Sequence, residues 1–171
     1  EPLGELDLSG FWNVEFERYD LKISNMHDGH SDINATGKFS PESRMLEAVA
    51  SLNHMHTAYA EPFVKEIFSE LGGSVSGDII VSGPLEDLTI SSEGTRLENA
   101  LLKVAYTNVP YYADGAFHIN DEGVFFDDIS IRDRQNGTGT ITGSINWDRF
   151  RDISFDTKIT VNEIAGINVT E

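Results

Sequence analysis

Period-two alternation of apolar and polar residues runs through most of this chain and constrains its fold more than any other feature. In Ser74–Ser82, for example, Val75, Ile79 and Val81 recur at alternate positions. Such alternation is typical of a strand with one buried face and one solvated face. The predicted strands are Phe11–Glu17, Tyr19–Ser24, Ser31–Phe39, Met45–Asn53, Ser74–Ser82, Leu88–Ser92, Leu97–Tyr106, Gly115–Asn120, Val124–Arg132, Thr138–Trp147 and Ile153–Val161.

Turn residues separate these segments at short intervals. Asp121-Glu122-Gly123, Gly83-Pro84 and Asn136-Gly137 have the composition of tight turns. Short strands joined by tight turns predict a mostly β protein, with an antiparallel sheet in meander order.

One segment, Ala60–Leu71, departs from the alternation. Its apolar residues recur at i, i+3, i+4 and i+7, Pro62 suits a first helical turn, and Gly72 suits the position after the last. The sequence therefore predicts a short amphipathic helix that covers one end of the β-sheet core. The apolar positions are Val64, Ile67, Phe68 and Leu71.

Glycine recurs within the strands, most densely in residues 73–83, which read GSVSGDIIVSG. A motif of apolar, Ser or Thr, Gly, any residue and apolar is repeated, and its glycine shares a face with the apolar residues. A glycine row on an inward face leaves room for a bulky neighbour, for sheet curvature or for a hydrocarbon ligand. The repeats are Leu8–Trp12, Ala35–Phe39, Val75–Ile79, Val81–Leu85 and Ile141–Ile145.

Composition excludes several classes of function. The chain has 171 residues, a formal net charge of −17 and no cysteine. Phosphate backbones would repel such an acidic protein, so nucleic-acid binding is not expected. Disulfides, thiolate metal sites and cysteine nucleophiles are ruled out. We expect a single β-rich domain over residues 1–171, excised from a longer protein because it starts at Glu1 without a methionine.

The candidate chemical residues have ordinary structural explanations. His54 and His56 lie on one side of a predicted strand, and His27 and His30 flank a turn, but no third metal ligand is indicated. Aspartates such as Asp127 lie at strand ends and turns, where this residue is favoured anyway. We therefore expect no catalytic residue, no metal and no cofactor.

The chain resembles the C-terminal region of the TamB (translocation and assembly module) family, most closely its versions from Bacteroidetes-type Gram-negative bacteria. The resemblance covers about residues 45–161. Its motifs are the glycine-rich strand before Gly83-Pro84-Leu85, the strand Asn99–Val104, the stretch Tyr106–Tyr111, the hairpin Asp133–Gly143 and the segment Tyr59–Leu71. The polar stretch Ser92–Arg96 departs from the family pattern, and a turn or a break in the groove is expected there.

The resemblance implies a periplasmic segment of an AsmA-like, bridge-like lipid-transfer protein whose full length is anchored in the inner membrane. Its sheet would be curved into an open, taco-like groove or half-barrel with an apolar interior. Its partners would be phospholipid acyl chains, and also an Omp85-type outer-membrane barrel or client β-barrel proteins. No catalytic residues follow from this family.

The apolar rows are the residues expected to line that groove, although they equally fit an ordinary closed core. Two alternatives stay open: a module that binds client strands along its sheet edge, and a closed β-sandwich that binds glycans or adheres to surfaces. The predicted groove residues are Val75, Ile79, Val81, Leu88, Ile90, Leu102, Val104, Phe117, Phe125, Ile129, Ile141, Ile145, Trp147, Phe155 and Ile159.

Overall fold

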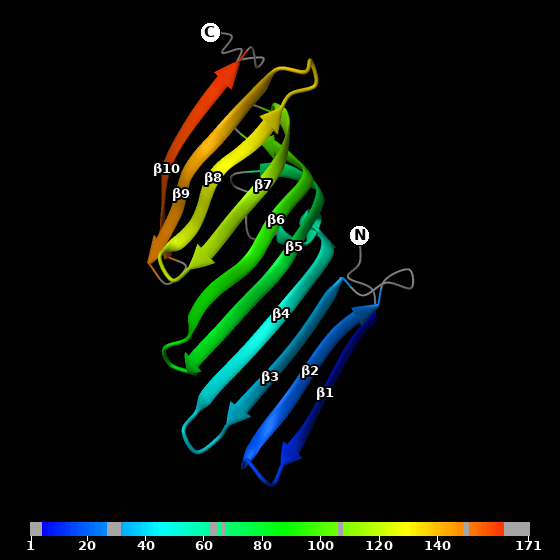
Figure 1. Cartoon of the computed structure of the whole chain (residues 1–171), viewed down its shortest axis with the longest axis vertical. Coiled ribbons are helices and arrows are strands. Elements are labelled where there is room, and N and C mark those ends of the chain that lie inside the picture. The colour runs from blue at the N-terminus through cyan, green and yellow to red at the C-terminus, as the bar shows by residue number, and fades with distance from the viewer. Residues whose placement is uncertain are drawn as a thin grey trace.

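The computed structural model of the protein describes residues 5–26, 32–61, 65, 68–105, 108–148 and 151–162. These residues form one open antiparallel sheet of ten strands, in which each strand pairs with its neighbours in the chain. The strands lie side by side in chain order, from β1 at the lower right of Figure 1 to β10 at the upper left. The predicted mostly β meander is confirmed. The strands are β1 (Glu5–Asn13), β2 (Arg18–Met26), β3 (Ile33–Ser40), β4 (Met45–His56), β5 (Phe68–Pro84), β6 (Thr89–Val104), β7 (Pro110–Asn120), β8 (Gly123–Arg132), β9 (Thr138–Asp148) and β10 (Arg151–Asn162).

The helix predicted over Ala60–Leu71 is wrong at both of its described ends, because Ala60 belongs to the 3-10 turn η1 (Thr57–Ala60) and Phe68–Leu71 belong to strand β5. Strand β5 already begins at Phe68, and residues 62–64 and 66–67 lie outside the described residues. Strand β6 extends far enough to give Leu71 a ladder partner in Leu102, and Leu71 is buried there. Pairing along a neighbouring strand therefore overrides the local helical spacing.

The turn expected at Ser92–Arg96 is also absent, since β6 is continuous across it. The ladder pairs Ser76 with Arg96 but Asp78 with Glu93, so two residues of β6 lie opposite one residue of β5. This is a β-bulge, which accommodates an extra residue without ending the strand. The segments predicted as two strands, Leu88–Ser92 and Leu97–Tyr106, thus belong largely to one.

The ladder register assigns side chains to two faces, because directly paired residues of antiparallel strands point to the same side. We call the face that carries Val75, Ile79 and Val81 the apolar face, and the opposite one the polar face. The apolar face also receives large side chains from every strand from β1 to β9. Among these are Leu6, Leu8, Trp12, Leu21, Ile23, Phe39, Leu46, Leu52, Met55, Ile90, Leu97, Leu102, Phe117, Ile119, Val124, Phe126, Ile129, Ile131, Ile141 and Ile145.

The sheet forms a single layer. Within the described part of the chain, every pair of strands in substantial contact is consecutive, and the substantial contacts of η1 are with β5. Register shifts occur in every ladder from β4–β5 to β9–β10, whereas the ladders that join β1 to β4 have none. Bulges bend strands and increase their twist. The irregularities that can bend this sheet therefore lie between β4 and β10.

Candidate functional site

The apolar face is the candidate functional site, and its exposure changes along the sheet. At the β1 end, Leu6 and Leu8 are 62% and 68% exposed, and Trp12 is 45% exposed. In β7 and β8, Ala113 and Ile129 are 0% and 3% exposed. The face is therefore open to solvent at the β1 end and packed in its β6 to β9 part.

The packed part is a hydrophobic cluster contributed by β6, β7, β8 and β9. Ala100 and Ala113 form a directly paired couple at its centre, beside Ile129 and Ile131. Small side chains at the centre of a bent sheet let larger neighbours close over them. Around them pack the half-buried side chains of Leu97, Leu102, Phe117, Phe126 and Ile141.

Most of the predicted groove residues share the apolar face, as the alternation required. Phe155 and Ile159 pair with Ile145 and Ile141 in the β9–β10 ladder, but their side chains lie outside the described part of the structure. The residues placed on the apolar face by the register are Val75, Ile79, Val81, Ile90, Leu102, Val104, Phe117, Ile129, Ile141 and Ile145.

Phe125 departs from this placement, because it lies on the polar face. It pairs with His118 and Ser144, and its ring stacks on His118 at 4.9 Å between centroids and 9° between planes. The ladder register shifts between Phe126 and Ile129, so the strict alternation predicted for β8 fails by one residue. Phe126 takes the apolar position instead.

Leu88 lies in the turn between β5 and β6 and not in a strand, and it is 43% exposed. Together with Ile90 and the half-buried Trp147 it lines a hollow of about 350 Å³ at one end of the apolar face. Carboxylates of Glu86, Asp87 and Asp121 border the same hollow. The hollow at this end of the sheet is therefore lined by both apolar and acidic residues.

The predicted site left out the first four strands, which contribute the most exposed part of the apolar face. Leu8 pairs with Ile23, and Gly10 pairs with Leu21, on the same side as Val81. The signal was present in the repeats Leu8–Trp12 and Ala35–Phe39, which carry the same spacing as the later ones. Extending the alternation to these repeats would have identified the additional residues.

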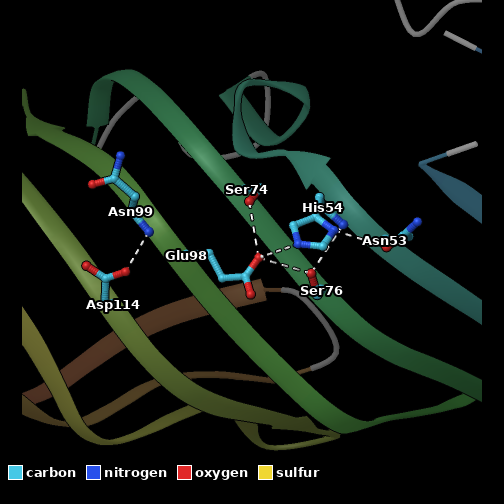
Figure 2. A network of polar contacts seen from close by, with 7 residues as sticks. All are labelled: Asn53, His54, Ser74, Ser76, Glu98, Asn99 and Asp114. Carbon is cyan, nitrogen blue, oxygen red and sulfur yellow. Dashed lines mark hydrogen bonds and ion pairs between the residues drawn. The ribbon is translucent and has the colours of Figure 1, made fainter. Parts of the chain in front are cut away.

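On the polar face, a network of side chains connects β4, β5 and β6 (Figure 2). The imidazole Nε2 of His54 lies 3.2 Å from Oε2 of Glu98, and the hydroxyls of Ser74 and Ser76 each donate to that oxygen at 3.4 Å. The other imidazole nitrogen, Nδ1, contacts Oδ1 of Asn53 at 3.0 Å. The imidazole contacts a carboxylate and an amide, and both serine hydroxyls donate to the carboxylate and not to the imidazole. The network therefore links neighbouring strands and does not have the serine–histidine contact of an activated nucleophile.

The same network satisfies backbone groups at the bulges. His54 has a left-handed φ of 52°, and its N–H donates to Oγ of Ser76 at 3.2 Å. Asn99, with φ 45°, donates its N–H to Oδ1 of Asp114 at 2.7 Å. A bulge takes a backbone group out of the ladder, and an unpaired N–H is costly. Serine and aspartate on the polar face thus replace the missing ladder partners.

The ionisable side chains of Asp20 and Tyr111 have shifted pKa values. The side-chain hydrogen bond from Asn13, at 2.9 Å, is the main cause that lowers the pKa of Asp20, and Arg18 adds to it. Burial raises the pKa of Tyr111 on the apolar face, and the carboxylate of Asp133 raises it further. Both shifts arise from ordinary packing and pairing.

His54 and His56 do not converge on a common point. His56 accepts a hydrogen bond from the N–H of Ala58 and caps η1, while His54 contacts Glu98. Among the described residues, no group of three or more histidine and acidic side chains is placed to hold a metal ion. In that same part of the chain, no helix has the length and hydropathy needed to cross a membrane.

Comparisons of the chain with protein-family models, with curated proteins and with solved structures found no match. The candidate site is therefore defined by the geometry of the apolar face alone.

Proposed function

We propose that this chain is a periplasmic segment of a TamB-like protein in a Gram-negative envelope, and that its apolar face holds phospholipid acyl chains. One observation carries the proposal: a ten-stranded, single-layer sheet keeps one face apolar from β1 to β9, with no second layer over it in the described residues. An ordinary globular sheet buries such a face against another element. Apolar ligand is one way to cover it.

The bulges support a curved sheet with the apolar face inside. They begin at the β4–β5 ladder, and the buried cluster lies on the apolar face of β6 to β9. A sheet bent in this direction would form an open, taco-like groove or half-barrel. The polar face, with its network around Glu98, would then face water.

The proposed mechanism is non-enzymatic. Each methylene of an acyl chain that leaves water for the apolar face contributes about 0.8 kcal/mol. Headgroups would stay in water at the open side of the groove. Many weak, equivalent contacts along the strands would let a chain move without a single tight site.

Photo-crosslinking in intact Gram-negative cells tests this proposal. A photoreactive amino acid at Val81, Val104 or Ile145, all on the apolar face, should capture phospholipid. The matched control is Ile80, the neighbour of Val81 on the polar face, which should capture little or none. Protein adducts alone at all three apolar positions would contradict lipid binding.

The open sheet edges support a second candidate, in which client outer-membrane strands or a partner barrel add to β1 or β10 by β-augmentation. Photoreactive residues in β1 would then capture protein, while those on the apolar face would capture nothing. The third alternative, a closed β-sandwich, does not match the single open layer of the described residues.

A further inference from the structure

A second hollow lies on the polar face, across β8, β9 and β10, and has a volume of about 370 Å³. Small-ligand sites have volumes of about 300–1,000 Å³, so the hollow is large enough to hold a small ring. The ladder register places it on the face opposite Val81, away from the proposed lipid site.

Phe125 gives this hollow an aromatic wall. Its half-buried ring stacks on the imidazole of His118 from β7, with 4.9 Å between centroids and 9° between planes. On the β9 side its ladder partner is Ser144, whose side chain is too short to cover the other face of the ring. Because Phe125 and Ser144 both line the hollow, a flat ligand there can continue the stack.

Polar groups of β8, β9 and β10 surround the rest of the hollow. Asp156 is the ladder partner of Ser144, and Lys158 is the partner of Thr142. The side chains of Asp156, Lys158 and Thr142 are exposed, as is that of Asp127 on β8. The hollow thus combines one aromatic wall with two carboxylates, an ammonium group and two hydroxyls.

We propose that this hollow binds a ring of a neutral glycan built from glucose or N-acetylglucosamine units. In such a ring the axial C–H bonds form two flat apolar faces, and the hydroxyl or acetamido substituents lie around the edge. The C–H hydrogens carry a partial positive charge that suits the negative face of the Phe125 ring. The hydroxyls at the edge donate to the carboxylates of Asp127 and Asp156 and accept from the ammonium group of Lys158.

Other classes of ligand fit the hollow less well. An acyl chain would take the charged groups out of water and give them no hydrogen-bond partner. An anionic ligand would be repelled by a chain with a net charge of −17. An aromatic peptide side chain would stack on Phe125 but would leave the carboxylates and the ammonium group without partners. A neutral sugar ring matches both the aromatic wall and the polar groups.

Nuclear magnetic resonance titration of the isotope-labelled 171-residue chain tests the proposal, with cellotetraose and chitotetraose as the probes. These are tetrasaccharides of glucose and of N-acetylglucosamine, and the tighter binder identifies the glycan. We expect amide shifts centred on Phe125, Ser144 and Asp156. Phe125→Leu keeps an apolar side chain but removes the ring, and it should weaken binding about tenfold or more. Phe125→Trp should retain binding.

The matched control is Phe11→Leu, the same substitution at a 64% exposed phenylalanine on the polar face of β1, and it should leave the affinity unchanged. N-acetyltryptophanamide represents an aromatic peptide side chain and should not shift the amides of the hollow. A response to this compound without a response to either sugar would assign the hollow to a peptide and overturn the inference. Shifts confined to other strands, no shifts with either tetrasaccharide, or equal affinity in Phe125→Leu and Phe11→Leu would also overturn it.

Discussion

Gly73 on β5 lies directly against the backbone of Asn99, the bulge residue of β6. A Cβ atom at Gly73 would come within 2.6 Å of the carbonyl carbon of Asn99, and the φ of Gly73 is 77°. Gly77 makes the same kind of approach one bulge further along, where a Cβ would lie 2.6 Å from Cα of Thr95. The glycines of the GSVSG stretch are therefore required by close backbone approach at two bulges.

Replacing Gly73 with alanine should destabilise the fold strongly. The added methyl would meet backbone atoms that cannot move aside, and the positive φ adds strain, so we expect a loss of about 3 kcal/mol or more. Equilibrium urea unfolding followed by circular dichroism measures this loss.

Gly94→Ala is the matched control for that variant. Gly94 also has a positive φ, 62°, but a Cβ there would meet no atom within 4 Å. Only the conformational strain remains, about 1 kcal/mol. Equal losses in the two variants would show that steric contact at the bulge contributes nothing.

Asn25 is completely buried, and its side-chain oxygen holds the backbone at the start of β3. Oδ1 accepts hydrogen bonds from the N–H groups of Asp32 at 3.0 Å and Ile33 at 2.7 Å. Asn25→Leu has a similar volume but leaves both N–H groups unsatisfied, so we expect a loss of about 3 kcal/mol despite its greater hydrophobicity. Thermal unfolding checks the loss.

The comparison variant for Asn25 is aspartate, which keeps an oxygen acceptor at the same position. Asn25→Asp should retain more stability than Asn25→Leu above the pKa of the introduced carboxyl. If leucine were tolerated as well as aspartate, the two hydrogen bonds would not stabilise the β2–β3 connection.

Much of the fold could be predicted from the sequence, because a sheet with one apolar face requires an apolar residue at every second position of its strands. The alternation around Val81 correctly predicted both the strand and the residues that share its apolar face. It failed at Phe125, where an inserted residue reverses the faces, and bulges leave no period of their own in the sequence. The helical spacing of Ala60–Leu71 gave a wrong prediction for its last residues. They pair with β6, a strand far along the chain, and a local sequence pattern does not contain that information.

The candidate site was less predictable than the fold. Sequence alternation shows which residues share a face, but not which part of that face packs on itself. Ile129 and Leu8 carry the same apolar signal, yet one is 3% exposed and the other 68%. Ile129 lies on a strand that is paired on both sides and packs in the buried cluster, whereas Leu8 lies on a strand that pairs only with β2. Neither placement can be read from the residues next to them in the sequence.

The raised pKa of Tyr111 predicts a stability change at alkaline pH. The unfolded chain releases the phenol proton near its ordinary pKa of 10.0, whereas the folded chain retains it to higher pH. Unfolding is therefore favoured increasingly from about pH 10 up to the raised folded pKa, and the stabilising contribution of neutral Tyr111 is lost over that window.

The Tyr111→Phe substitution removes this titration, and it tests whether Tyr111 lowers the free energy of unfolding at alkaline pH. The free energy of unfolding of the variant should fall less than that of the parent chain between neutral pH and the alkaline window. Absorbance of the phenolate during pH titration provides an independent measurement. A parallel decline in both proteins would mean that Tyr111 does not contribute to the alkaline loss.

The two tryptophans report on whether lipid reaches the apolar face. Trp12 is 45% exposed in the open part of that face, and Trp147 is half-buried in the hollow beside Leu88. In a Trp147→Phe variant, phospholipid with brominated acyl chains should quench Trp12 emission, because bromine quenches only on close approach. Trp12→Phe should show weaker quenching of the remaining Trp147. The same phospholipid without bromine corrects for changes in polarity around the rings. Unchanged Trp12 emission with the brominated lipid would mean that acyl chains do not occupy the exposed end of the apolar face, whatever binds elsewhere on the sheet.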